Sequence, residues 1–158
     1  MFKVIIPALG LLGLVTVGAR APSAAEAQPM GWHLTYEGPV AKLAYGVANS
    51  DQLVLMLACD AGSDAAYVWG AVEPQASSVV LAANGVATRA EPREVIDAMT
   101  GEPAMETVVS MRDPAMRAFT RTGALTVTGD AGAFDMPADR EEKALIAQFS
   151  DHCGGARA

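Results

Sequence analysis

The sequence has few of the residues on which most catalytic and nucleic-acid-binding proteins depend, and each shortage excludes a class of function. Its 158 residues include only two cysteines and two histidines, and 11 basic side chains stand against 18 acidic ones. The resulting net charge of −7 would repel nucleic acids and anionic membrane surfaces. We therefore expect no nucleic-acid partner, and a cationic protein is the favoured kind of partner.

The scarcity of histidine leaves little room for acid–base catalysis. A serine hydrolase needs a base beside its nucleophile, but no serine of this chain stands in a G-x-S-x-G elbow. The nearest stretch, AGSDA at 61–65, has the composition of a hairpin turn. A zinc site built from His33, His152 and the two cysteines would lack the CxxC or HxxxH spacing of such sites. We predict that the protein is not an enzyme and holds no metal or cofactor.

The acidic residues are numerous but do not follow a calcium-binding pattern. Counting from Asp130, Glu141 stands at the twelfth position, as in an EF-hand loop, but Asp135 occupies the sixth, where glycine is needed. Carboxylates at turns and helix starts more often act as solvated caps. The chain also lacks a P-loop and a glycine-rich dinucleotide motif.

The longest apolar run, residues 4–17, lies near the N-terminus. Lys3 precedes it, and the Ala-Glu-Ala at 25–27 places small side chains where signal peptidase needs them. This pattern predicts a signal peptide cut between Ala27 and Gln28. The run is shorter than the roughly 20 residues that cross a bilayer, so a membrane anchor is disfavoured. We expect a periplasmic or secreted protein with no membrane insertion after cleavage.

Removal of the signal peptide, residues 1–27, would leave the mature chain, residues 28–158. These 131 residues are enough for one domain with its own core. The removed segment carries two basic residues and one acidic residue, so the mature net charge becomes −8. We predict that 28–158 forms a single β-rich domain.

Turn residues are frequent in the mature chain, and the apolar runs between them are short, as is typical of an antiparallel β domain. Asn84-Gly85 between two apolar runs is the strongest hairpin signal. Residues 90–104 fit a loop, a short helix or an irregular strand equally well. The predicted strands and hairpins are 32–38, 41–47, 53–59, 65–72, 78–89, 105–111 and 124–137.

Two helices are predicted within this pattern. The first has Asp113 as its cap and Pro114 at its first helical position, and it ends at Gly123. The second begins at Asp139, with Glu142 three residues later, in the pattern of a capping box. The whole pattern predicts a mainly β (α+β) fold: an antiparallel β-sandwich or partly open barrel with two short helices, the last one C-terminal.

The two cysteines fall on inward-facing stripes. Cys59 ends an apolar strand, where it shares a face with Leu53, Leu55 and Leu57. Cys153 lies four residues after Phe149 on the apolar side of the last helix. Because oxidising compartments favour pairing, we predict a Cys59–Cys153 disulfide, which would stabilise the fold by roughly 4 kcal/mol through loop closure. A catalytic Cys–His pair is disfavoured, since its thiol would have to survive oxidation.

Five aromatic residues fall on predicted strands: Trp32, Tyr36, Tyr45, Tyr67 and Trp69. Such side chains mostly form core or cross-strand pairs. Gathered on one sheet face, they would line a binding groove instead. The periodicity does not separate these two interpretations.

Three stretches resemble a group of small, exported, uncharacterised alphaproteobacterial proteins that have two cysteines. They are LVLMLACD at 53–60, SMRDPAMRAFTRTGALTV at 110–127, and the last helix with its DHC ending at 151–153. The cysteines of that group occur at matching places, so the resemblance implies the same disulfide. It implies no activity.

These observations favour a non-catalytic periplasmic protein that binds a partner or supports the envelope. An inhibitor of a secreted enzyme, such as a lysozyme or a protease, is the alternative, because the acidic charge would attract a cationic enzyme. A carrier of a small apolar ligand is a further alternative, and it requires the five aromatic residues to line one cavity.

Overall fold

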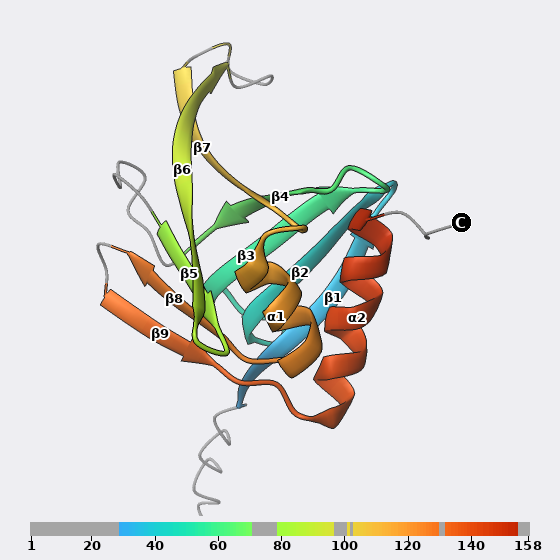
Figure 1. The fold of residues 1–158 in the computed structure, drawn as a ribbon. Helices are drawn as coiled ribbons and strands as arrows, with labels where there is room; N and C mark the ends of the chain where they lie inside the picture. The colour runs from blue at the N-terminus through green and yellow to red at the C-terminus, as the bar shows by residue number, and fades with distance from the viewer. Residues whose placement is uncertain (1–28, 71–78, 97–100, 102, 130–131, 155–158) are drawn as a thin grey trace, which may run out of the picture.

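The computed structural model describes residues 29–70, 79–96, 101, 103–129 and 132–154. Within these ranges the chain forms nine strands and two helices (Figure 1). The strands are β1 Met30–Glu37, β2 Val40–Val47, β3 Leu53–Asp60, β4 Ala65–Trp69, β5 Val79–Ala83, β6 Val86–Ile96, β7 Pro103–Ser110, β8 Leu125–Gly129 and β9 Gly132–Met136, and the helices are α1 Pro114–Thr122 and α2 Arg140–Gly154. The predicted fold class is confirmed, because the protein is mainly antiparallel β with two helices, the last one C-terminal.

The strands pair in one continuous antiparallel order, β1-β2-β3-β4-β7-β6-β5-β8-β9. The order divides into two sheets at β6, because residues 86–90 of that strand pair with β5 and residues 91–96 pair with β7. We call the side with β1, β2, β3, β4 and β7 sheet A, and the side with β5, β8 and β9 sheet B. β1 and β9 do not pair within the described residues, so the sheets are not closed into a barrel.

The turn between β5 and β6 has the geometry that the sequence predicts. Asn84 and Gly85 have positive φ angles of 49° and 78°, as a tight Asn-Gly hairpin requires. The ambiguous stretch 90–104 is strand where it is described, since β6 continues to Ile96 and β7 starts at Pro103. Figure 1 shows this part of β6 and β7 extending beyond the other strands as a two-stranded arm.

The alternation predicted for β3 is confirmed over most of the strand. Leu55, Leu57 and Cys59 are fully buried in the core. Leu53 shares their parity but is 44% exposed. The β2–β3 register shifts at this end, so the regular alternation does not extend to Leu53.

The two helices pack next to each other over the inner side of the sheets (Figure 1). α2 crosses β1, β2 and β3, while α1 packs on β5 and β6. α1 buries Met116 and Phe119, and α2 buries Ile146, Phe149 and Cys153, as their spacing predicts. The helices therefore supply the apolar layer that fills the space between the two sheets.

The start of α1 differs in one respect from the sequence expectation. Asp113 occupies the N-cap position, but its side chain accepts no capping hydrogen bond. Pro114 follows at the first helical position, where its missing N–H has no intrahelical partner to lose. The helix ends at Gly123 with a φ of 74°, and a Cβ atom there would collide with Lys143 of α2. Glycine is thus required by backbone conformation and by the approach of the second helix.

The start of α2 is the predicted capping box. Glu142 accepts the Asp139 N–H at 2.8 Å, and the Asp139 carboxylate accepts the Glu142 N–H at 2.9 Å. The second carboxylate oxygen of Glu142 accepts the N–H of Trp32 in β1, also at 2.9 Å. A Cβ atom on neighbouring Gly31 would collide with this carboxylate. Glu142 therefore caps the helix and also binds the edge strand of sheet A.

Candidate binding surfaces

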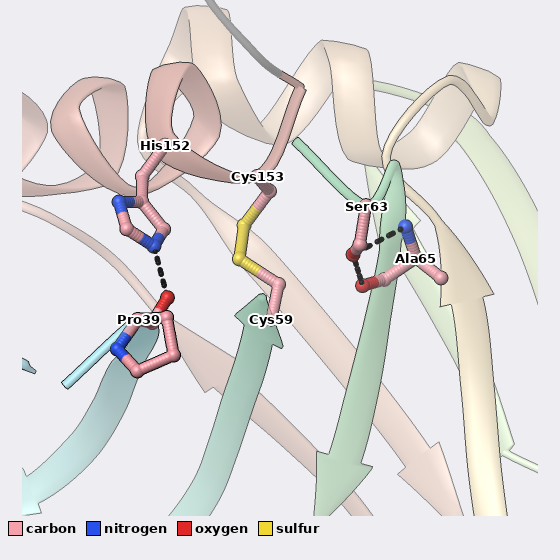
Figure 2. The surroundings of a disulfide bond; sticks show 6 residues. All are labelled: Pro39, Cys59, Ser63, Ala65, His152 and Cys153. Atoms are coloured by element: carbon pink, nitrogen blue, oxygen red, sulfur yellow. Dashed lines mark hydrogen bonds between the residues drawn. A yellow bond between two sulfur atoms is a disulfide. The ribbon is translucent and has the colours of Figure 1, made fainter. Parts of the chain in front are cut away.

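The C-terminus of α2 is attached to sheet A by a disulfide (Figure 2). Backbone hydrogen bonds add to this attachment. Cys59 and Cys153 are bonded, with their Cα atoms 5.6 Å apart and both side chains fully buried. In the β3–β4 turn, the Gly62 N–H donates to the His152 carbonyl at 2.8 Å, and the Asp64 N–H donates to the Cys153 carbonyl at 3.0 Å. The structure thus joins the cysteines that the sequence pairs. The other predicted site, the cleavage position between Ala27 and Gln28, lies outside the described residues.

Both histidines have backbone partners. The His152 Nε2–H donates to the Pro39 carbonyl at 2.8 Å (Figure 2), and the His33 Nε2 contacts the Gly46 carbonyl at 3.3 Å. The two sulfur atoms are consumed by the disulfide. The structure therefore does not bring the histidines and cysteines together as metal ligands or as a catalytic pair.

The five aromatic residues lie in three separate places. Trp32 is buried against Tyr45, with ring centroids 5.2 Å apart, and also packs on Phe119 of α1. Tyr36 is half exposed beside His152. Tyr67 and Trp69 lie together on β4, with centroids 5.7 Å apart. They do not line one common cavity.

The outer face of sheet A carries an apolar surface. Tyr67 and Trp69 point away from the core, since the alternate β4 residues Ala66 and Val68 are buried in it. Trp69 is paired with Met56 of β3, and Tyr67 is paired with Ala58 on one side and Val108 of β7 on the other. Directly paired residues share a face of the sheet. We call the residues of this set that reach solvent, Met56, Tyr67, Trp69 and Val108, the outer patch. Ala58 lies between them but is buried.

A shallow hollow of about 380 Å³ lies beside the outer patch. Its lining includes His33, Ala44 and Leu53, together with the loop between β2 and β3. Ala44 pairs directly with Met56, so the hollow and the outer patch form one continuous surface. Leu53 is 44% exposed and Trp69 is 41% exposed, so large apolar side chains reach solvent at both sides of this surface.

A second hollow, of about 570 Å³, lies between α1 and α2 at the disulfide end of the fold. Arg117 and Arg121 of α1 line it, and Arg112, which forms an ion pair with Asp64, lies at its rim. We call it the arginine groove. The groove was not predicted from the sequence, although the four-residue spacing of Arg117 and Arg121 places both on one side of a helix.

The pKa of one tyrosine on β2 is perturbed. Burial raises the pKa of Tyr45 above its ordinary value, and the nearby negative charge of Glu142 raises it further. Both causes disfavour the phenolate. The neutral phenol is therefore the form that the fold stabilises.

Comparison with protein-family models, curated proteins and solved structures found no match to this chain. Neither of the helices in the described part of the chain is long and apolar enough to cross a membrane. The binding surfaces must therefore be interpreted from their own chemistry.

Proposed function

We propose that the protein is a non-catalytic binding protein of the periplasm or the secreted fraction, and that a protein partner docks on its outer patch. One observation carries this proposal: the outer face of sheet A is aromatic and apolar at β3, β4 and β7. The inner face of the same sheet is already packed on the core. An antiparallel sheet with one packed face normally presents polar side chains on the other. Exposed apolar surface in that position is typical of an interaction site.

The composition of the outer patch suits a protein interface. Trp and Tyr are the residues that most often dominate binding energy, and Met adapts its shape to a partner. Tyr67 and Trp69 lie next to each other with Met56 opposite Trp69, so one partner element would contact all three. The mature charge of −8 favours a cationic partner, which electrostatic attraction would bring to the surface faster.

Export is part of this proposal. It is supported by the predicted signal peptide and is compatible with the Cys59–Cys153 disulfide, since disulfides persist in oxidising compartments. The absence of a common cavity for the five aromatic residues leaves the carrier alternative without a supporting observation.

Site-specific photo-crosslinking in the native envelope would test the outer patch. A photoreactive phenylalanine analogue replaces Trp69, and a second protein carries it at Val86, which is exposed to a similar degree on β6. We expect a discrete adduct with a basic protein, and only from position 69. The yield of this adduct should fall as the salt concentration is raised. The same adducts from both positions, or none from position 69, would overturn the proposal.

Inhibition of a secreted enzyme is the alternative function, and one assay distinguishes it from the proposed binding function. The purified protein is titrated into lysozyme and protease reactions at low and high salt. Inhibition at low salt that is lost when Trp69 is changed to Ser would place the inhibitory contact on the outer patch. Full enzyme activity at both salt concentrations would remove the alternative.

A further inference from the structure

The arginine groove gathers positive charge in an acidic protein. Arg112, Arg117 and Arg121 all line it, although the chain has only 11 basic residues in total. Two carboxylates, Asp64 and Asp151, also line the groove. Because Asp64 is paired with Arg112, the remaining charges are two guanidinium groups and one carboxylate. The groove is locally cationic, in contrast to the whole molecule.

Fold stability does not account for this arrangement. Arg117 and Arg121 are four residues apart on α1, and like charges at that spacing destabilise a helix. Within the described ranges neither forms an ion pair. Arg121 gains from its place in the last turn, but Arg117 lies mid-helix, where the dipole offers nothing. Both are exposed and face the groove, so an anion is the missing counterpart.

We propose that the arginine groove binds a small soluble phosphate monoester. Two guanidinium groups on adjacent turns present more N–H donors than the two oxygens of one carboxylate can accept, whereas a phosphate offers three oxygens. Ser150 of α2 lines the opposite wall and adds a hydroxyl donor. Arg112 holds the Asp64 carboxylate by its ion pair, which limits the repulsion of an incoming anion.

A free ester is favoured over a lipid headgroup because of the charge outside the groove. The mature chain carries a net charge of −8, so an anionic bilayer repels the molecule as a whole. A small ester can enter the groove without bringing an anionic bilayer close to the acidic protein. The groove volume of about 570 Å³ lies in the range of small-molecule sites. This proposal does not depend on the outer patch, which lies on the other side of sheet A.

Calorimetric titration of the full mature protein with inorganic phosphate and with glycerol 3-phosphate tests the proposal. The buffer contains no phosphate, and ionic strength is held low and constant with chloride. The double variant R117Q/R121Q removes the two unpaired cations. R140Q is the matched control, because Arg140 is also an exposed helical arginine but does not line the groove. Circular dichroism and melting temperature verify that each variant is folded.

We expect saturable binding of both probes to the wild-type protein and to R140Q, and at least an approximately tenfold weaker affinity for R117Q/R121Q. D151N removes the one unpaired carboxylate and should tighten binding about two- to threefold, which a merely structural role of Asp151 would not do. Loss of binding in the double variant together with this gain would establish the site.

Three results would overturn the proposal. The first is absence of saturable binding at millimolar phosphate, or equal binding by the double variant and the wild type. The second is acetate binding with the same affinity, which would assign the groove to carboxylates. The third is binding only to vesicles that contain phosphatidic acid, which would assign it to a lipid headgroup.

Discussion

The two helices lie next to each other over the same core, yet they are held in place by different means. α2 has a reciprocal capping box at its first turn, a carboxylate contact to the edge strand β1, and a disulfide and turn hydrogen bonds at its last turn. α1 has no side-chain cap at its start and is fixed mainly by burial of its apolar side and by Gly123 at its end. Polar and covalent ties are concentrated on only one of them.

The difference follows from position in the chain. α1 is continuous at both ends with strands that belong to the sheets, so its entry and exit are already constrained. α2 is the last element described, and only its start is constrained in this way. A terminal helix can detach without disrupting the contacts of other elements, so the free energy of its local opening is low. The ties at both ends of α2 raise the free energy of that opening.

Removal of the disulfide should produce the largest effect and should affect α2 more than α1. The variant Cys59→Ala/Cys153→Ala opens a loop with a sequence separation of 94. We expect a loss of about 4 kcal/mol of unfolding free energy, because loop-closure entropy returns to the unfolded chain. Denaturant unfolding with and without reductant measures it, and the variant should no longer respond to reductant.

Hydrogen exchange of the same variant sharpens the comparison. Amides of α2 near Cys153 should lose protection first, while those of α1 near Phe119 should be retained under conditions where the domain stays folded. Equal loss in both helices would contradict the idea that the disulfide acts on α2 locally.

Glu142 should give the next largest effect. Its carboxylate accepts the N–H of Asp139 and the N–H of Trp32, so Glu142→Ala leaves both donors without that acceptor. We expect a loss of about 2 kcal/mol from the two charge-assisted hydrogen bonds, measured by denaturant unfolding. Glu141→Ala is the matched control in the same helical turn and should cost about 0.5 kcal/mol. Similar losses of unfolding free energy in both variants would show that Glu142 contributes only through its charge at the helix N-terminus and not through the two hydrogen bonds.

The two N-cap positions offer a direct test of the asymmetry between the helices. Asp139→Ala removes a carboxylate that accepts the N–H groups of Glu141 and Glu142, and should cost about 1 kcal/mol. Asp113→Ala removes a carboxylate without a capping hydrogen bond, and should change stability by less than about 0.5 kcal/mol. Thermal unfolding of the two variants compares them, and equal losses would show that α1 is capped in solution.

Tyr45 should give the smallest effect, visible only at alkaline pH. Its pKa is raised in the folded protein, chiefly by burial and then by Glu142, so the native state retains the phenolic proton longer than the unfolded chain does. That stabilisation is complete below the unfolded pKa of about 10 and declines as pH rises through the higher folded pKa. Melting temperatures of wild type and Tyr45→Phe between pH 8 and 11 test this. The wild type should lose more stability than the variant above pH 10, and parallel curves would contradict it.

Local signals predicted much of the fold. The Asn84-Gly85 turn and the Asp139/Glu142 capping box each involve only a few consecutive residues, so both can be predicted from the sequence. The Cys59–Cys153 pairing was also predictable, because only two cysteines were present and both lay on inward-facing stripes.

Other features depend on partners that a sequence does not reveal. The strand at 90–96 contains Pro92 and three charged residues, a poor strand composition. It forms because β7 pairs with it on one side, and proline is tolerated where the other side has no ladder. Leu53 is exposed because of a register shift in its neighbour strand. The arginine groove is lined by α1, by the end of α2 and by Asp64 of the β3–β4 turn, which lie far apart in the sequence and meet only in the fold.

The division of β6 between two sheets has a consequence for solubility. In the described pairings each half of β6 has a hydrogen-bonded neighbour on one side only, so the molecule has strand edges in its middle as well as at β1 and β9. Open edges invite the strands of other copies and are a route to aggregation. Arg89, Pro92, Arg93 and Glu94 occupy this strand, and charge and proline are what make such an edge a poor template. The residues that weaken the strand signal of β6 in the sequence are thus the ones that keep the folded protein from adding strands to itself.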